Sequence, residues 1–137
     1  MTVMHISGCA YLYQKADVTN VEELNKRLPE NLKDQRLLGV CLHKDFGGYF
    51  SARTVVLTNT QIDEKYRRKI EPARLLKWEE DIIELLVEMN TNWAEGKWRD
   101  FGEPTVKYSK EAKRYFDAAP KDRHKIIEEI RSKSCAE

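Results

Sequence analysis

The sequence predicts an α+β fold in one domain, residues 1–137. Two apolar runs, 37–43 and 49–57, flank a Gly-Gly corner, a pattern typical of paired strands. Residues 73–94 place apolar side chains three and four positions apart, as an amphipathic helix does. The chain has 137 residues, 41% of them hydrophobic, which suits one core and is too apolar for a disordered chain.

The first element is expected to be a helix over residues 3–15. Met4, Ala10, Tyr11 and Leu12 offer it apolar contacts.

The next segment, 17–36, is polar and is interpreted as a surface insertion with a short helix. Thr19 or Asn20 can cap that helix, and the acidic first turn suits its dipole. Pro29 and Asn31 are expected to end it.

Residues 39–57 predict an antiparallel hairpin that turns at Asp45–Gly48. The first run is almost continuously apolar, as in a strand buried on both faces. Glycine suits the turn because it accepts a positive φ without a Cβ clash. A polar connection, 58–72, follows.

Helices are expected in the last part of the chain. The apolar stripe of the 73–94 helix is interpreted as core packing and consists of Leu75, Trp78, Ile82, Leu86, Met89 and Trp93. Ser109 can cap a second helix with Tyr115 and Phe116 on its apolar side. Pro120 suits the first turn of a third.

Charge and cysteine content exclude several classes of protein. Lys and Arg number 24 and Asp and Glu 23, so the basic excess of a nucleic-acid-binding protein is absent. No apolar run approaches the roughly 18 residues of a membrane helix, and the N-terminus lacks the features of a signal peptide. Cys9, Cys41 and Cys135 form no CxxC pair or zinc spacing, so we expect no metal site and a reducing, cytoplasmic setting.

Few residues carry signs of chemistry. The sequence contains no glycine-rich phosphate loop and no HExxH motif. His43 is interpreted as stabilising the turn, and the acidic residues 79–81 as a solvated face.

Three arginines follow or interrupt apolar sequence: Arg53, Arg99 and Arg123. The guanidinium fork binds a carboxylate through two parallel hydrogen bonds, and a buried arginine needs such a partner. An ordinary ion pair with Asp100 or Asp122 is the alternative interpretation.

Four segments resemble the CblC family of cobalamin-processing proteins, in order between about His5 and Ile127: GCAYLYQ, GVCLHKDFGGYFSARTVVL, NTNWAEGKWRDF and YSKEAKRYFDAAPKDR. The resemblance implies a flavin nitroreductase-like antiparallel sheet with flanking helices. The chain would hold only the C-terminal part of that domain, without its N-terminal half.

The resemblance also implies an activity. CblC proteins bind base-off cobalamin and remove its upper axial ligand. Cyanocobalamin is decyanated with electrons from reduced FMN or FAD or a reductase partner, and alkylcobalamins are dealkylated by glutathione. The expected enzyme is therefore a cyanocobalamin reductase and alkylcobalamin:glutathione S-alkyltransferase. A downstream cobalamin-trafficking protein is an implied partner, and a homodimer is compatible with the resemblance.

Site residues carry over by motif. Arg53, Arg99 and Arg123 match glutathione-binding arginines, which would clamp its carboxylates and favour its thiolate. The cobalamin contacts that match are His5, Leu12, Tyr13, Gln14, Gly39, Cys41 and Ala52. Cys41 is assigned to packing against the corrin.

Two other functions remain open at this point. A non-catalytic cobalamin-binding or trafficking adaptor, or an inactive fragment, would need no glutathione site. A nitroreductase-like flavin enzyme is a further alternative.

Overall fold

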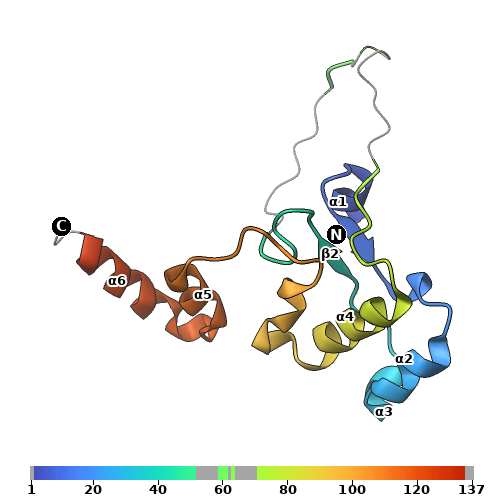
Figure 1. Cartoon of the computed structure of the whole chain (residues 1–137). Helices are drawn as coiled ribbons and strands as arrows, with labels where there is room; N and C mark the ends of the chain where they lie inside the picture. The colour runs from blue at the N-terminus through green and yellow to red at the C-terminus, as the bar shows by residue number, and fades with distance from the viewer. Residues whose placement is uncertain (1, 52–58, 62, 64–70, 135–137) are drawn as a thin grey trace.

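The structure is a computed structural model and describes residues 2–51, 59–61, 63 and 71–134 (Figure 1). Its helices, 3-10 helices (η) and strands are α1 (Thr2–Ile6), β1 (Tyr11–Tyr13), η1 (Lys15–Asp17), α2 (Val21–Arg27), α3 (Glu30–Lys33), β2 (Val40–Leu42), α4 (Glu79–Thr91), η3 (Trp93–Glu95), η4 (Lys97–Asp100), α5 (Lys110–Asp117), η5 (Pro120–Asp122) and α6 (Arg123–Ser134).

Within the described residues the sheet consists of β1 and β2, paired antiparallel. The paired residues are Tyr11 with Leu42, Leu12 with Cys41, and Tyr13 with Val40. Successive side chains of a strand point to opposite faces. Val40 and Leu42 therefore belong to the core on one face, while Cys41 points to the other.

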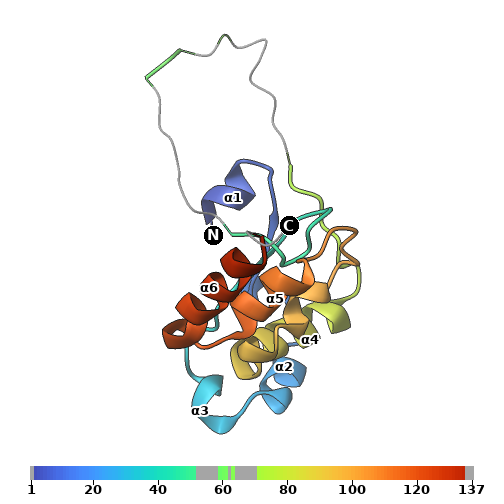
Figure 2. The same ribbon diagram turned by 90° about the vertical axis from the view of Figure 1, so that its left-hand side faces the viewer.

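The core forms where α4 packs against β2, η1 and α2. Its most buried members are Tyr13, Leu24, Val40, Leu42, Ile82, Ile83, Leu85 and Leu86. Helices α5 and α6 pack against each other at one end of the molecule, with the linker before α5 joining them to the rest (Figures 1 and 2).

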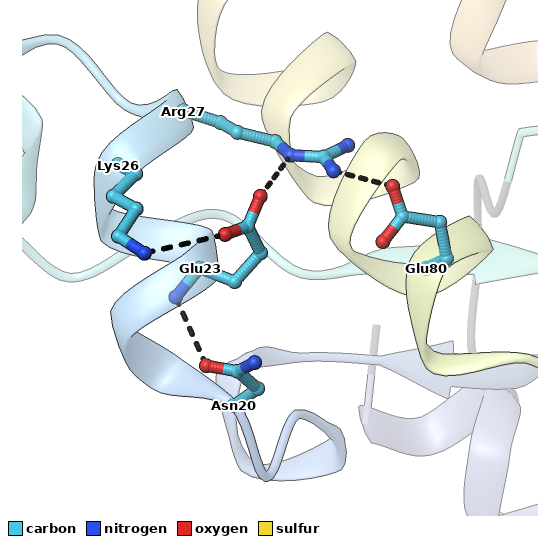
Figure 3. Close-up of polar contacts among 5 residues, drawn as sticks. All are labelled: Asn20, Glu23, Lys26, Arg27 and Glu80. Carbon is cyan, nitrogen blue, oxygen red and sulfur yellow. Dashed lines mark hydrogen bonds and ion pairs between the residues drawn. The ribbon is translucent and has the colours of Figure 1, made fainter.

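Polar contacts fasten α2 to the start of α4. Asn20 caps α2 by accepting a hydrogen bond from the Glu23 backbone N–H at 3.1 Å. The Arg27 guanidinium lies between Glu23 of its own helix and Glu80 of α4 (Figure 3). Glu79 accepts a hydrogen bond from the Asn20 backbone N–H at 2.7 Å, so the acidic start of α4 is an anchor as well as a solvated face.

The predicted helix over residues 3–15 is only partly correct. Helix α1 ends at Ile6, and residues 11–13 form β1 instead. Pairing with β2 buries Tyr13 completely, and this tertiary contact outweighs local helical preference.

The interpretation of 17–36 as a polar surface insertion is also partly wrong. Its helix begins after the Asn20 cap as predicted, but Val18, Leu24 and Leu28 are buried in the core. Pro29 separates α2 from α3, so the segment forms two short helices and Asn31 lies inside the second.

The hairpin prediction for 39–57 is only partly correct. A turn forms at 44–46, one residue before the predicted start at Asp45, and in the described residues β2 pairs with β1 rather than with the second apolar run. His43 and Gly47 exchange backbone hydrogen bonds of 2.9 and 2.8 Å, and Gly47 has a φ of 51°, which glycine accepts readily. The His43 Nδ1 accepts a hydrogen bond from the Asp45 backbone N–H, as the turn-stabilising interpretation expects. Residues 49–51 are not part of a strand, and 52–58 lie outside the described residues.

The long helix is shorter than predicted, because α4 begins at Glu79 rather than near residue 73. Ile82 and Leu86 of the predicted stripe are core residues, whereas Trp78 and Trp93 are 73% and 64% exposed. Both tryptophans lie beyond the ends of α4, so the periodicity of the helix does not direct their side chains toward its apolar face. None of the helices in the described part of the chain has the length and apolar character needed to cross a membrane.

The predicted starts of the last two helices are confirmed. The Ser109 hydroxyl accepts a hydrogen bond from the Ala112 backbone N–H at 3.1 Å and caps α5. Pro120 opens η5, which leads directly into α6. These signals act within one helical turn, so the sequence alone identifies them.

Tyr13→Phe is expected to destabilise the protein by about 1–3 kcal/mol. The Tyr13 hydroxyl accepts a hydrogen bond from the Leu76 backbone N–H at 2.8 Å, and both residues are buried. Phenylalanine would leave that N–H buried without an acceptor. Thermal denaturation measures the loss, with Tyr115→Phe as control, because the Tyr115 ring is half-buried in α5. Equal stability of the two variants would contradict the assignment.

Candidate functional site

A cavity of about 280 Å³ lies beside β2. The turn after β2, helix α4 and η4 form its other walls. Its lining is mostly apolar and sulfur-containing and consists of Met4, Gly39, Val40, Cys41, Gly48, Phe50, Ser51, Met89 and Trp98. A mostly apolar lining of this kind is typical of small-molecule pockets.

Two glycines allow the walls of the cavity to approach closely. A Cβ at Gly39 would lie 2.9 Å from the carbonyl oxygen of Tyr13 in β1, so the close approach of β1 requires glycine at position 39. A Cβ at Gly48 would lie 2.6 Å from the Trp98 ring. Any larger residue at either position would change the shape of the cavity.

Cys41 lines this cavity and is 6% exposed. Burial raises the pKa of its thiol, so the neutral form predominates at neutral pH. A neutral thiol is a poor nucleophile, which agrees with the packing role expected for Cys41. Among the described residues, no group of His, Cys, Asp and Glu side chains is arranged to hold a metal ion.

His5 and Leu12 join α1 to β1. The His5 Nδ1 accepts a hydrogen bond from the Leu12 backbone N–H at 3.1 Å. The imidazole also meets the Tyr11 ring edge-on, with the ring centroids 4.9 Å apart. Both residues support the strand next to the cavity but are not among its lining residues.

Tyr13 and Gln14 also lie away from the cavity lining. Tyr13 is fully buried in the core, and Gln14 is exposed, with its backbone N–H bonded to Asp17. Ala52 lies outside the described residues. Of the residues expected to contact cobalamin, the cavity therefore brings together Gly39 and Cys41.

Arg99 of η4 is half-buried and lies against aromatic rings. Its guanidinium carbon is 4.7 Å from the Trp98 ring centroid and 6.0 Å from that of Tyr108. A Cβ at Gly96, which has a φ of 76°, would collide with the guanidinium. Within the described structure no carboxylate forms an ion pair with Arg99.

The alternative ion pair between Arg99 and Asp100 is not formed. Asp100 instead accepts hydrogen bonds from Lys107 at 2.6 Å and from the Tyr49 hydroxyl at 2.9 Å. Burial opposes its ionisation, but these two bonds hold the pKa of Asp100 below its usual range. Burial and the bond to Asp100 together raise the pKa of Tyr49 to about 12.

Arg123 begins α6 and is tied to the end of α5. Its Nε donates to the Ala118 carbonyl at 3.2 Å and its Nη2 to the Phe116 carbonyl at 3.3 Å. Asp122 pairs with Lys125 and not with Arg123. A guanidinium has five N–H donors, so Arg123 keeps some for a ligand while it caps α5.

Aromatic rings connect the two arginines, and we call these rings the aromatic ladder: Tyr115, Phe116 and Tyr108. The Arg123 guanidinium lies 5.3 Å from the Tyr115 centroid at one end, and that of Arg99 lies against Tyr108 at the other. These rings were not predicted from the sequence. The only signal there was their closeness to Arg99 and Arg123 along the chain. Arg53 lies outside the described residues.

The sequence profile of the methylmalonic aciduria and homocystinuria type C family matches residues 1–127. A cyanocobalamin reductase / alkylcobalamin dealkylase of Homo sapiens is 35% identical over 127 residues, which cover 92% of this chain and 41% of that protein. The protein of the same name from Gallus gallus is 32% identical over 126 residues, covering 92% and 49%.

A solved structure is also similar. It is that of a Caenorhabditis elegans B12-trafficking protein CblC, a homologue of human MMACHC, with a TM-score of 0.71 and 26% identity. The match covers 92% of this chain and 47% of that one. The chain thus spans less than half the length of each of these relatives.

Proposed function

Because the chain belongs to the methylmalonic aciduria and homocystinuria type C family, we propose that it processes cobalamin by removing the upper axial ligand. The proposed reactions are reductive decyanation of cyanocobalamin and glutathione-dependent dealkylation of alkylcobalamins. The observation that carries the proposal is the Arg99 guanidinium, stacked on Trp98 with no carboxylate partner in the described structure. A protein that only carried cobalamin would not need this anion-binding group.

The substrate cobalamin is proposed to place one edge of its corrin against the cavity beside β2. Cys41 and Met89 offer polarisable sulfur, and Trp98 offers a flat ring. Family membership is the ground on which we propose that cobalamin binds base-off.

Glutathione is the proposed nucleophile for alkyl groups. Arg99 and Arg123 would hold its two carboxylates, and Arg53 is proposed to join them. Their positive charge lowers the thiol pKa and so favours the thiolate. The sulfur then bonds to the alkyl carbon as the cobalt–carbon bond breaks. Both electrons of the broken bond stay on cobalt, which changes from Co(III) to Co(I).

Decyanation needs an external electron. One electron reduces Co(III) to Co(II), and cyanide leaves with the electron pair of its bond to cobalt. We propose reduced FMN or FAD, or a reductase partner, as the source. FMN or FAD is proposed only as an electron donor, and no described residue is assigned to it.

The remaining family properties are proposals as well. They comprise a flavin nitroreductase-like sheet, a cytoplasmic location, a downstream cobalamin-trafficking partner and a homodimer. The antiparallel pairing of β1 with β2 is compatible with such a sheet.

Titration of this chain with methylcobalamin, followed by absorbance, tests the proposal. We expect a base-off spectrum. Cys41→Ser should weaken binding by at most about thirtyfold, because a hydroxyl is costlier to bury than a thiol by at most roughly 1–2 kcal/mol. Exposed Cys9→Ser is the matched control.

Two results would contradict this account. An unchanged base-on spectrum at saturation would refute cobalamin binding by this chain. Normal binding with complete loss of dealkylation in Cys41→Ser would identify Cys41 as a nucleophile rather than a packing residue.

A further inference from the structure

Tyr108 connects two parts of the molecule that each carry a proposed glutathione ligand. It lies in the linker between η4, which holds Arg99, and α5. Its ring contacts the Arg99 guanidinium and stacks on Phe116 of α5, with centroids 4.7 Å apart and planes inclined by 23°. No other described ring contacts both Arg99 and α5.

A second aromatic ring packs against Tyr108 as well. Tyr49 meets it edge-on at 5.0 Å, with the planes inclined by 85°. The Tyr49 hydroxyl is in turn held by Asp100, the neighbour of Arg99. The Tyr108 ring therefore packs against Arg99 of η4, Tyr49 and Phe116.

The linker itself is docked on the turn after β2. The Val106 backbone N–H donates to the Asp45 carbonyl at 3.0 Å, and the Thr105 hydroxyl donates to the same oxygen at 3.3 Å. Lys107 forms an ion pair with Asp100 at 2.6 Å. These contacts hold residues 105–107 against η4 and the turn after β2, directly before Tyr108 and α5.

We propose that Tyr108 is a positioning residue. Its ring holds the Arg99 guanidinium in place and, through Phe116 and the α5–α6 pair, sets the distance between Arg99 and Arg123. The ligand class is a thiol that carries two separated carboxylates. The inference rests on the proposed function, because it concerns the same glutathione site.

Tyr108→Leu and Tyr108→Phe test the proposal. The Tyr108 hydroxyl has no hydrogen bond within the described structure, so phenylalanine should preserve every contact that matters. Leucine removes the cation–π contact and the stack. It should raise the glutathione concentration for half-maximal dealkylation of methylcobalamin by about two- to thirtyfold. The rate at saturating glutathione and the rate of reductive decyanation should stay unchanged.

Two outcomes of these assays would overturn the proposal. The first is that Tyr108→Phe behaves like Tyr108→Leu, since the ring would then not be the important feature. The second is that Tyr108→Leu lowers both activities equally, which indicates a general role in the fold.

A spectroscopic measurement separates this proposal from the proposed function. The Arg99 Nε–H group lies near aromatic rings. Its NMR resonance is identified as the one that is lost from the spectrum of Arg99→Gln. Its chemical shift should move in Tyr108→Leu and stay in place in Tyr108→Phe. An unmoved resonance in Tyr108→Leu overturns the positioning role. Wild-type dealkylation that does not depend on glutathione would instead refute the proposed function, whatever the NMR result.

Discussion

Leu86→Ala is expected to lower the free energy of unfolding by about 2–5 kcal/mol. Leu86 has no exposed surface and lies in the core between α4 and the sheet. Alanine removes buried apolar atoms and leaves a cavity, because close-packed neighbours relax only partly. Urea denaturation measures the change as a lower midpoint with an unchanged m-value.

Glu84→Ala is the matched control, since Glu84 is an exposed residue of the same helix. It should change stability by no more than about 0.5 kcal/mol. A loss below about 1 kcal/mol for Leu86→Ala would show that α4 does not form the core as described.

Helix starts marked by a capping side chain or a proline were the part of the fold that the sequence predicted best. Asn20 and Ser109 cap α2 and α5, and Pro120 opens the turn before α6. Each signal acts between residues within one helical turn. No information from the rest of the fold is needed to interpret it.

Strand β1 could not be predicted in this way. Tyr11 and Tyr13 become extended because they pair with 40–42, which lie about thirty residues further along the chain. Local apolar content does not separate a helix from a strand that short. The same limit explains why Trp78 and Trp93 were wrongly predicted to pack in the core. Their spacing continues the helical stripe, but both lie outside α4 and are exposed.

The candidate site was predicted in part. Family motifs predicted Arg99, Arg123 and Cys41 as ligand-binding residues, and these roles stay predictions. The structure shows the two arginines joined by the aromatic ladder. Tyr108 was not identified, because its importance comes from contacts with both η4 and α5. Such contacts appear only when both elements are placed in space.

Arg99→Gln is expected to raise the glutathione requirement of dealkylation about ten- to a hundredfold. The physical reason is that a charge-assisted hydrogen bond to a carboxylate contributes roughly 1.5–3 kcal/mol. Lysine should restore the affinity only partly, because it lacks the planar fork. Reductive decyanation should suffer less, since it needs no thiolate.

Arg123→Gln and Arg53→Gln are expected to act in the same direction. Arg123 also bonds to two carbonyls at the end of α5, so its substitution should lower stability in addition. Arg114→Gln is the matched control, because Arg114 of α5 is paired with Glu129 and is not assigned to the site. It should leave both activities unchanged.

The glutathione dependence of methylcobalamin dealkylation, measured side by side for the wild type, Arg99→Gln and Arg114→Gln, tests the central claim most directly. We predict saturable wild-type kinetics, half-saturation shifted about ten- to a hundredfold for Arg99→Gln, and no shift for Arg114→Gln. Decyanation in the same preparations should change little. An unshifted curve for Arg99→Gln, or an equal loss of dealkylation, decyanation and cobalamin binding, would contradict the assignment of Arg99 to glutathione.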